Sequence, residues 1–247
     1  MGADEVAQLA GLVSIVLLPG SLPNYQEQLN VEMITELDGD HLTSSAPVAR
    51  TEWQARCSVL FACKGSLYHS LPVDVYDIDR DALTFPGGTA VVAHPPCRAW
   101  ASLRHCAKPR EGEKDLAPWA VEQVRRWGGV LEHPLNSILW RTLGLPEGVR
   151  DRDEYGGFTL KVDQFWWGHR ARKRTRLYIC GIEPRDVPAY PLKLGEAPCT
   201  VGLWSGRDKE NCRPSISKKE FELTPRGFAE WLVDLALRAD RARSTAA

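Results

Sequence analysis

The stretch Thr89-Ala90-Val91-Val92-Ala93-His94-Pro95-Pro96-Cys97 decides which fold the sequence predicts. Its first five residues are small or β-branched, which is typical of a short buried strand. The two prolines that follow deny the chain a helical continuation, so Cys97 stands on a stiff loop directly after the strand. Open α/β sheets bind their ligands at the carboxyl ends of parallel strands. The stretch therefore places a thiol where such a sheet carries out its chemistry.

Strand and helix patterns alternate on both sides of this stretch. Short apolar runs are separated by segments whose apolar side chains recur at helical spacing. The predicted strands are 58–62, 73–78, 89–93, 129–132 and 174–179, and the predicted helices are 116–127 and 228–237. This alternation predicts an α/β fold with a doubly wound, mostly parallel sheet.

The first 55 residues differ in composition from the rest of the chain. They are acidic and contain no lysine or arginine before Arg50. A strand at 12–18 and a helix at 26–37 are predicted within them. We expect residues 1–55 to form an N-terminal acidic extension or flap that covers an edge of the core, and residues 56–247 to form the main domain. An acidic lid or a segment that mimics DNA is the alternative interpretation.

The composition restricts the classes of partner. The chain has 247 residues and a formal net charge of -1, so any surface that binds nucleic acid must be a local one. Its 7 cysteines include no CxxC pair, which argues against a disulfide framework or a zinc ribbon. The cluster of His94, Cys97, His105 and Cys106 matches no common zinc spacing, so no metal is expected.

The sequence does not predict a membrane protein. The longest apolar stretch, Leu9 to Leu18, is too short to span a bilayer and ends at a Pro-Gly pair. Without basic residues at its start it does not resemble a signal peptide either. We therefore expect no membrane partner and a cytoplasmic location.

Three local patterns indicate chemistry. His94 and Arg98 flank Cys97, and such cationic neighbours lower the pKa of a thiol. Glu132 closes a short apolar strand just before a His-Pro turn. Each pattern also has a plainer interpretation: Cys97 as a buried structural cysteine and Glu132 as a solvated turn residue.

The third pattern is a run of alternating arginines. If residues 170–176 belong to a strand, the period of two puts all four arginines on one face, where they suit phosphates and a base carbonyl. A solvated basic strand is the plainer interpretation. The four are Arg170, Arg172, Arg174 and Arg176.

Taken in order, these patterns resemble the DNA (cytosine-5)-methyltransferases. That family has a Pro-Cys loop, a Glu-Asn-Val strand end and a Gln-x-Arg-x-Arg strand. The matches here are Pro96-Cys97, Glu132-His133-Pro134 and Arg172-Lys173-Arg174-Thr175-Arg176. Ser137 and Trp140 after the Glu-x-Pro make the chain similar to the compact, phage-encoded members. The resemblance covers 58 to about 181 and implies a truncated class I methyltransferase (Rossmann-like) sheet, in the host cytoplasm if phage-encoded.

The resemblance also implies S-adenosyl-L-methionine as cofactor and DNA as partner. Residues 60–66 are similar to an eroded Leu-Phe-Ala-Gly-x-Gly-Gly loop, and one strand-helix unit of the family is missing. The large target-recognition region is absent as well, so we expect low sequence specificity or a protein partner that supplies it. The implied cofactor-binding residues are Phe61, Gly65, Asp77 and Pro95.

The implied mechanism is attack of the Cys97 thiolate on C6 of a flipped cytosine. Glu132 would hold N3, Arg176 the O2 carbonyl, and Arg174 a phosphate or the catalytic loop. DNA would also be contacted by Arg98, Arg170 and Arg172. Two alternatives remain open: pyrimidine C5 modification with another one-carbon donor or base, and a non-catalytic DNA-binding relic of the fold.

Overall fold

The computed structural model describes residues 56–201 and 213–246. The chain divides into two compact units, Met1–Pro47 and Val48–Ala247, and all described residues belong to the second. The strand and helix predicted at 12–18 and 26–37, and the proposed role of residues 1–55, lie outside the described residues. Within the described ranges, no helix has the length and apolarity that a membrane crossing requires.

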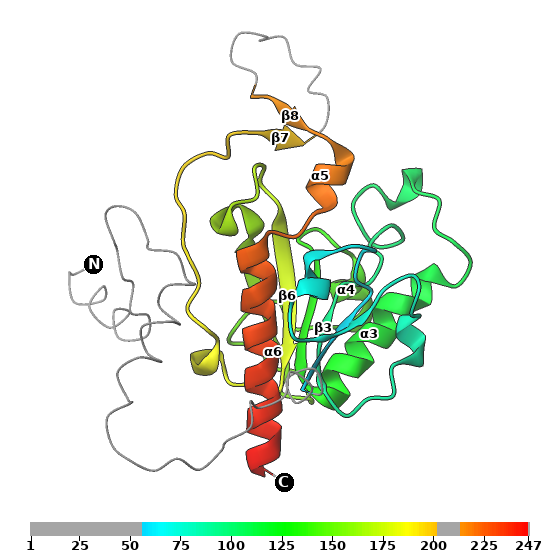
Figure 1. Ribbon diagram of the computed structural model, residues 1–247, viewed down its shortest axis with the longest axis vertical. Coiled ribbons are helices and arrows are strands. Elements are labelled where there is room, and N and C mark those ends of the chain that lie inside the picture. The colour runs from blue at the N-terminus through cyan, green and yellow to red at the C-terminus, as the bar shows by residue number, and fades with distance from the viewer. Residues whose placement is uncertain (1–55, 202–212, 247) are drawn as a thin grey trace, which may run out of the picture. The chain divides into compact units, whose positions relative to one another are not determined.

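The fold is α/β, with a mostly parallel six-stranded sheet that is compatible with a Rossmann-like arrangement (Figure 1). The strand order is β2-β1-β3-β4-β6-β5, and only β6 runs against its neighbours. The strands are β1 (Cys57–Leu60), β2 (Asp74–Tyr76), β3 (Ala90–Ala93), β4 (Gly129–Pro134), β5 (Phe158–Asp163) and β6 (Arg174–Cys180). A separate parallel pair is formed by β7 (Thr200–Val201) and β8 (Ser215–Ile216).

The two longest helices, α3 and α6, cover opposite faces of the sheet. The α-helices are α3 (Glu113–Trp127), α4 (Leu139–Leu143), α5 (Lys218–Glu222) and α6 (Arg226–Ala246). Short 3₁₀ turns are η3 (Leu67–Ser70), η4 (Ala82–Thr84), η5 (Arg104–Cys106), η6 (Gln164–Trp167) and η7 (Pro184–Asp186).

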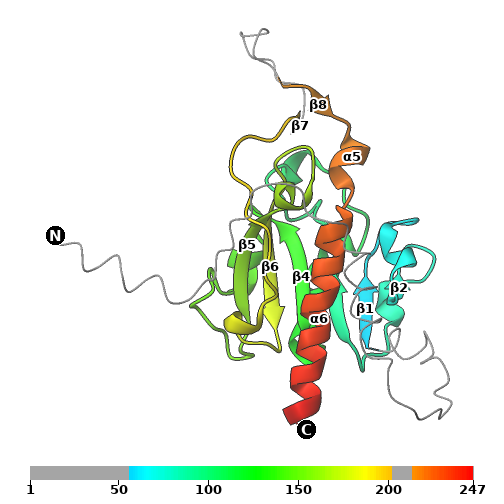
Figure 2. The same ribbon diagram turned by 60° about the vertical axis from the view of Figure 1, so that its left-hand side comes forward.

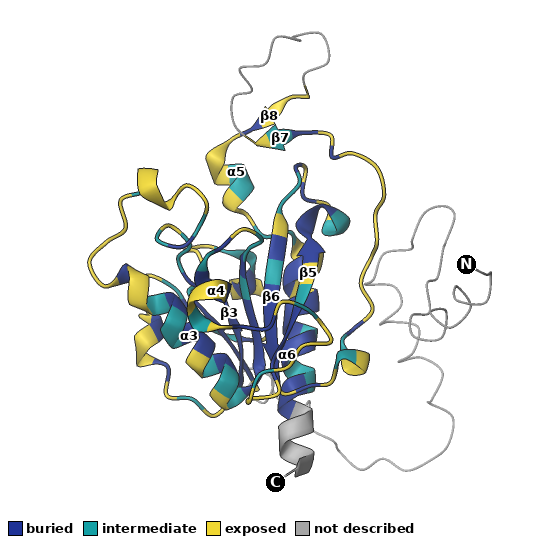
Figure 3. Ribbon diagram, turned by 180° about the vertical axis from the view of Figure 1, so that it is seen from behind, coloured by how far each residue is buried: buried dark blue, intermediate teal, exposed yellow. Residues whose placement is uncertain are grey.

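Alternation along each strand divides the core into two layers. Val59, Val92 and Val130 face α6, which lies across one face of the sheet (Figure 2). Their neighbours Leu60 and Leu131 face the other way, into the layer covered by α3 and α4. The strands are therefore buried on both sides, as Figure 3 shows by their dark blue colour between helices with exposed outer faces. This explains why they read as continuous apolar runs in the sequence.

The strands and helices predicted between residues 58 and 237 are present with shifted bounds, but the arginine run is not one strand. Strand β6 begins only at Arg174, so the prediction that four arginines share one strand face is wrong. The antiparallel hairpin of β5 and β6 needs a connection, and residues 164–173 supply it, with η6 at its start. Arg170 and Arg172 lie in this connection rather than in the ladder.

Candidate active site

Functional side chains gather at one edge of the sheet. The parallel strands β1, β3 and β4 end at this edge, and β6 begins there because Pro134 of β4 pairs with Thr175 of β6. The edge therefore carries the loops that follow β1 and β3, the end of β4, and the connection into β6. Helix α5 lies at the same end of the domain (Figure 1).

A chain of hydrogen bonds links side chains from four of these segments. The phenol of Tyr68 is 2.8 Å from His94 Nε2, and His94 Nδ1 is 3.0 Å from Glu132 Oε2. A carboxylate only accepts hydrogen bonds, so Nδ1 carries a proton, and in the neutral imidazole Nε2 accepts from Tyr68. On the other side, Gln164 Nε2 donates to Glu132 Oε1 at 3.2 Å and contacts Thr175 Oγ1 at 3.3 Å. Both carboxylate oxygens of Glu132 are thus held in place.

This network keeps Glu132 ionised. Burial by itself raises the pKa of the carboxyl group, but the hydrogen bond and charge of His94, together with Lys173, lower it to about 2. The side chain is 14% exposed, so part of it faces solvent. Glu132 is therefore an oriented acceptor rather than a free turn residue.

The thiol of Cys97 is partly buried, and the negative charge of Glu132 acts on it. Burial and the Glu132 carboxylate raise the pKa of Cys97, while Lys173 lowers it. The prediction that His94 and Arg98 lower this pKa is wrong, because both side chains are engaged elsewhere. His94 bonds to Glu132, and Arg98 forms an ion pair with the buried Glu113.

Lys173 belongs to the site although no sequence pattern singled it out. Its ammonium group acts electrostatically on Glu132 and Cys97, and burial lowers its own pKa. It donates to the carbonyls of Glu222 at 3.4 Å and Leu223 at 3.2 Å, at the end of α5. Sequence analysis missed Lys173 because the alternating arginines around it favoured the even-numbered positions of the run as the functional ones.

Arg176 does not reach this site. It pairs with His133 in the ladder, whereas Glu132 pairs with Leu177, so Arg176 and Glu132 point to opposite faces of the sheet. The Arg176 guanidinium lies 5.5 Å from the Trp140 ring centroid and forms an ion pair with Glu147 at 3.2 Å. Cys97 and Glu132 therefore lie at the same edge of the sheet, whereas Arg176 points to the opposite face from Glu132. Arg174 is exposed at the start of β6, on the same face as Arg176.

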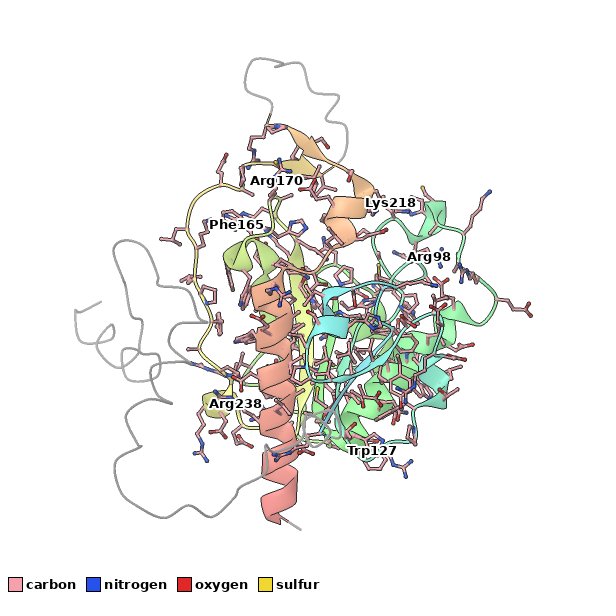
Figure 4. The ribbon with its side chains drawn as sticks, in the orientation of Figure 1. Arg98, Trp127, Phe165, Arg170, Lys218 and Arg238 are labelled. Atoms are coloured by element: carbon pink, nitrogen blue, oxygen red, sulfur yellow. The ribbon has the colours of Figure 1, made fainter. Side chains whose placement is uncertain are left out.

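The arginines expected to contact DNA are held by carboxylates. Arg98 pairs with Glu113, Arg170 with Glu220 at 2.9 Å, and Arg172 with Asp163 at 3.0 Å. Figure 4 places Arg98 on the α3 side and Arg170 beside the β7–β8 pair. They do not form one basic surface.

A different basic segment follows Cys97 directly. Residues 101–111 form an exposed loop that includes η5 and is anchored to the loop after β3, because Ala101 N donates to Cys97 O at 2.8 Å. Arg104, Lys108 and Arg110 are exposed there, and within the described ranges no ion pair involves their side chains. This loop, rather than the arginine run, offers cations to an anionic ligand.

The residues expected to bind a cofactor surround the ends of β1 and β2. Phe61 adopts a left-handed conformation with φ 62°, unusual for a side chain of that size, so the chain turns sharply after β1. A Cβ at Gly65 would meet nothing within 4 Å, so the loop has open space beside it. Pro95 is buried directly after β3.

Asp77 follows β2 as an oriented carboxylate. It accepts hydrogen bonds from the backbone amides of Asp79 and Arg80 and lies 3.1 Å from His69 Nε2. The Asp79 amide and the other donors lower the pKa of Asp77. Ile78 beside it is 66% exposed. An ionised acceptor next to an exposed apolar side chain fits a ribose hydroxyl next to an aromatic base.

No group of three or more His, Cys, Asp or Glu side chains within residues 56–201 and 213–246 is arranged to hold a metal ion. A scan of protein-family models finds none that matches the chain, and a search of curated proteins finds no significant match.

Proposed function

We propose that the protein is a DNA-modifying enzyme of the cytosine-5 methyltransferase type, with Cys97 as its nucleophile. The observation that carries the proposal is the convergence of Cys97, from the loop after β3, and Glu132, from the end of β4, on one edge of the sheet. Mere binding of DNA needs neither a thiol nor a buried oriented carboxylate. The convergence therefore favours an enzyme over a binding relic.

The sheet topology is compatible with the Rossmann-like fold that the proposal requires. The sheet is mostly parallel, and its one reversed strand, β6, lies between β4 and the edge strand β5. At the other edge, β2 is the last strand, which agrees with the loss of one strand-helix unit. The pattern supports the fold class, while the side chains at the carboxyl edge support the chemistry.

The chemistry begins with the Cys97 thiolate and the C6 carbon of a flipped cytosine. A bond forms between sulfur and C6, the C5–C6 double bond breaks, and its electrons make C5 nucleophilic. Glu132 accepts hydrogen bonds only, so it holds the amino group of the base and favours a proton on N3. Transfer of the methyl group to C5 would release S-adenosylhomocysteine. The C5 proton then passes to a water molecule, the electrons of the C5–H bond re-form the C5–C6 double bond, and the C6–sulfur bond breaks to restore the thiolate.

S-Adenosyl-L-methionine supplies the methyl group when bound. The residues at the β1 and β2 ends fit its nucleoside half, with Asp77 as acceptor for ribose hydroxyls and Ile78 against the adenine. At the methionine half, Cys63 and Ser66 stand where the family loop has glycines. Lys64, at the variable position between Cys63 and Gly65, pairs with Asp79 at 2.7 Å. Isothermal calorimetry with S-adenosylmethionine tests this donor, and Asp77→Ala should abolish the heat. No binding to the wild-type protein would favour the alternative of another one-carbon donor.

Nucleoside mass spectrometry tests the modifying activity. We expect 5-methylcytosine in DNA from methylation-deficient cells that express the wild-type protein, and none with Cys97→Ser. Cys106→Ser, an exposed cysteine on the adjacent loop, is the matched control and should retain activity. Equal modification by the Cys97→Ser variant would overturn the nucleophile assignment.

A further inference from the structure

His94 lies between Tyr68 and Glu132 and contacts both side chains. Its Nε2 atom is 2.8 Å from the Tyr68 hydroxyl oxygen, and its Nδ1 atom is 3.0 Å from Glu132 Oε2. The backbone is fixed as well, because the His94 amide donates to Leu60 O at 3.0 Å. Tyr68 is buried, and only 13% of the His94 side chain is exposed. The imidazole is thus held from both sides by hydrogen-bond partners.

The hydrogen bonds of this chain run in one direction while Glu132 is ionised. A carboxylate has no proton to donate, so His94 Nδ1 carries the hydrogen. In the neutral ring, Nε2 then has a free lone pair, and the Tyr68 hydroxyl donates to it. Tyr68 thereby fixes the tautomer of His94, and this tautomer directs an N–H group at Oε2.

Gln164 holds the other carboxylate oxygen from a separate segment. Its Nε2 atom donates to Glu132 Oε1 at 3.2 Å. The Gln164 backbone is fixed on both sides, because its amide donates to Lys173 O at 3.0 Å and its carbonyl accepts from the His169 amide at 3.2 Å. The side chain of Gln164 is fully buried. The loop after β3 and the connection between β5 and β6 therefore clamp the carboxylate together.

The clamped carboxylate keeps two acceptor positions for a ligand. Its two oxygens offer about four lone-pair positions. His94 occupies one on Oε2 and Gln164 one on Oε1, and the described residues supply no further hydrogen bond to either oxygen. The Glu132 side chain is 14% exposed, so it is open to a ligand on one side. One lone pair on each oxygen therefore remains for two neighbouring donors.

We propose that His94 is a positioning residue whose Nδ1–H, directed by Tyr68, holds Glu132 as a two-point acceptor for a base edge with two neighbouring N–H donors. The inference rests on the proposed function, since cytosine with a proton on N3 presents such an edge through N3–H and its 4-amino group. In uracil and thymine a carbonyl oxygen replaces the amino group and would face a lone pair of Glu132. His94 thus contributes to the selection of cytosine.

Two substitutions separate the two hydrogen bonds of His94. The side-chain N–H of asparagine lies near the position of Nδ1, so His94→Asn keeps the donor to Glu132 and loses the contact with Tyr68. The amide of glutamine reaches the position of Nε2, so His94→Gln keeps a partner for Tyr68 and leaves Oε2 without its donor. Both variants bury a similar amide, so a merely structural role of the histidine would affect them alike.

The test is an NMR titration of the full chain at pH 8 with benzamidine and with benzamide. Benzamidine carries two neighbouring N–H donors, and benzamide, of the same size, has a carbonyl oxygen in place of one of them. The wild type should bind benzamidine about tenfold more tightly than benzamide. His94→Asn should keep the affinity for benzamidine within about threefold, and His94→Gln should weaken it about tenfold. His105→Gln changes an exposed histidine and should have no effect.

Nitrogen NMR of the histidine rings at pH 8 tests the tautomer directly. The signals that disappear in His94→Asn belong to His94. In the wild type they should show a proton on Nδ1 and none on Nε2.

Three results would overturn the inference: a wild type that does not prefer benzamidine, equal affinities of His94→Asn and His94→Gln, or a His94 proton on Nε2 alone. None of these measurements needs DNA or a methyl donor. Absence of DNA modification by a protein with the expected binding pattern would therefore contradict the proposed function and leave the role of His94 standing.

Discussion

At the scale of single residues, neighbouring side chains on β4 face opposite environments. Glu132 points into the hydrogen-bonded network, whereas His133 points into the α3 layer, where its ring lies 6.4 Å from Trp140. Burial lowers the pKa of His133 to about 4, so this imidazole stays neutral at ordinary pH. The strand thus places an ionised acceptor and a neutral ring one residue apart.

His133 should make the protein sensitive to acid. Its pKa is lower in the folded state than the ordinary 6.5, so protons bind the unfolded chain preferentially between pH 6.5 and 4. The free energy of unfolding should fall across this window by about 3 kcal/mol, and no further below it from this group. Urea titrations at several pH values measure this, with His133→Gln as the comparison. A variant with the same pH slope as the wild type would refute the assignment.

Glu132 also makes the free energy of unfolding fall as the pH falls, but in a lower pH range than His133. Its folded pKa of about 2 lies below the ordinary 4.5, so its stabilisation is present above pH 4.5 and is lost as the pH falls toward 2. Glu132→Gln should remove the loss in this window. Because the charge of Glu132 raises the pKa of His133, its removal should also extend the His133 loss to a somewhat lower pH. Unfolding curves measure both effects, and a loss below pH 4.5 that is as large in Glu132→Gln as in the wild type would contradict the assignment.

At the scale of elements, the close approach of β3 and β4 positions the site. Gly129 pairs with Val91 at φ 114°, and a Cβ there would collide with the Val91 backbone. This contact fixes the register that brings the end of β4 level with the loop after β3. The pairing therefore connects the position of Glu132 to that of Cys97.

Gly129→Ala should destabilise the protein by about 3 kcal/mol or more, because strain at positive φ adds to a backbone collision. Gly144→Ala is the matched control. Gly144 also has a positive φ, of 63°, but a Cβ there meets nothing within 4 Å, so a loss of only about 1 kcal/mol is expected. Chemical denaturation compares the two. Equal losses would show that the collision with Val91 is relieved.

Sequence patterns predicted the strands that consist of apolar residues and missed the strand in which apolar and polar residues alternate. Buried strands such as β3 were predictable because both faces are apolar. Strand β5 was missed because polar residues alternate with its apolar ones, although Thr159 is buried and accepts a hydrogen bond from Trp140 at 2.8 Å. The same limit hid Lys173, since only the register of the hairpin decides that Arg176 points away from Glu132 while the charge of Lys173 acts on that carboxylate.

At the scale of the whole domain, the basic side chains near the site differ in whether carboxylates pair with them. Three of the predicted DNA-contacting arginines are neutralised by carboxylates, while the loop after Cys97 carries exposed cations. Phosphates of a DNA strand would therefore lie along this loop if the base enters at Cys97. With a net charge of -1, any field that attracts a polyanion must be local.

The combined change of Arg104, Lys108 and Arg110 to Gln should weaken DNA binding about tenfold or more at moderate salt. Each lost phosphate contact lowers the slope of log affinity against log salt by about 0.9, so the slope should fall by up to about 3. Arg141 and Arg150, changed together to Gln, are the control and should have little effect. Fluorescence anisotropy with a DNA duplex measures both. A larger loss from Arg170→Ala with Arg172→Ala would restore the arginine run as the binding surface.

The most direct measurement of the central claim is covalent trapping on a DNA duplex that contains 5-fluorocytosine. Fluorine at C5 cannot leave as a proton does, so the bond between Cys97 and C6 should persist through denaturation when the methyl donor is present. Peptide mass spectrometry should locate the adduct on Cys97. Cys97→Ser should give no adduct, and Cys106→Ser should give the full amount. An adduct on another cysteine, or methylated cytosine formed by the Cys97→Ser variant, would contradict the account.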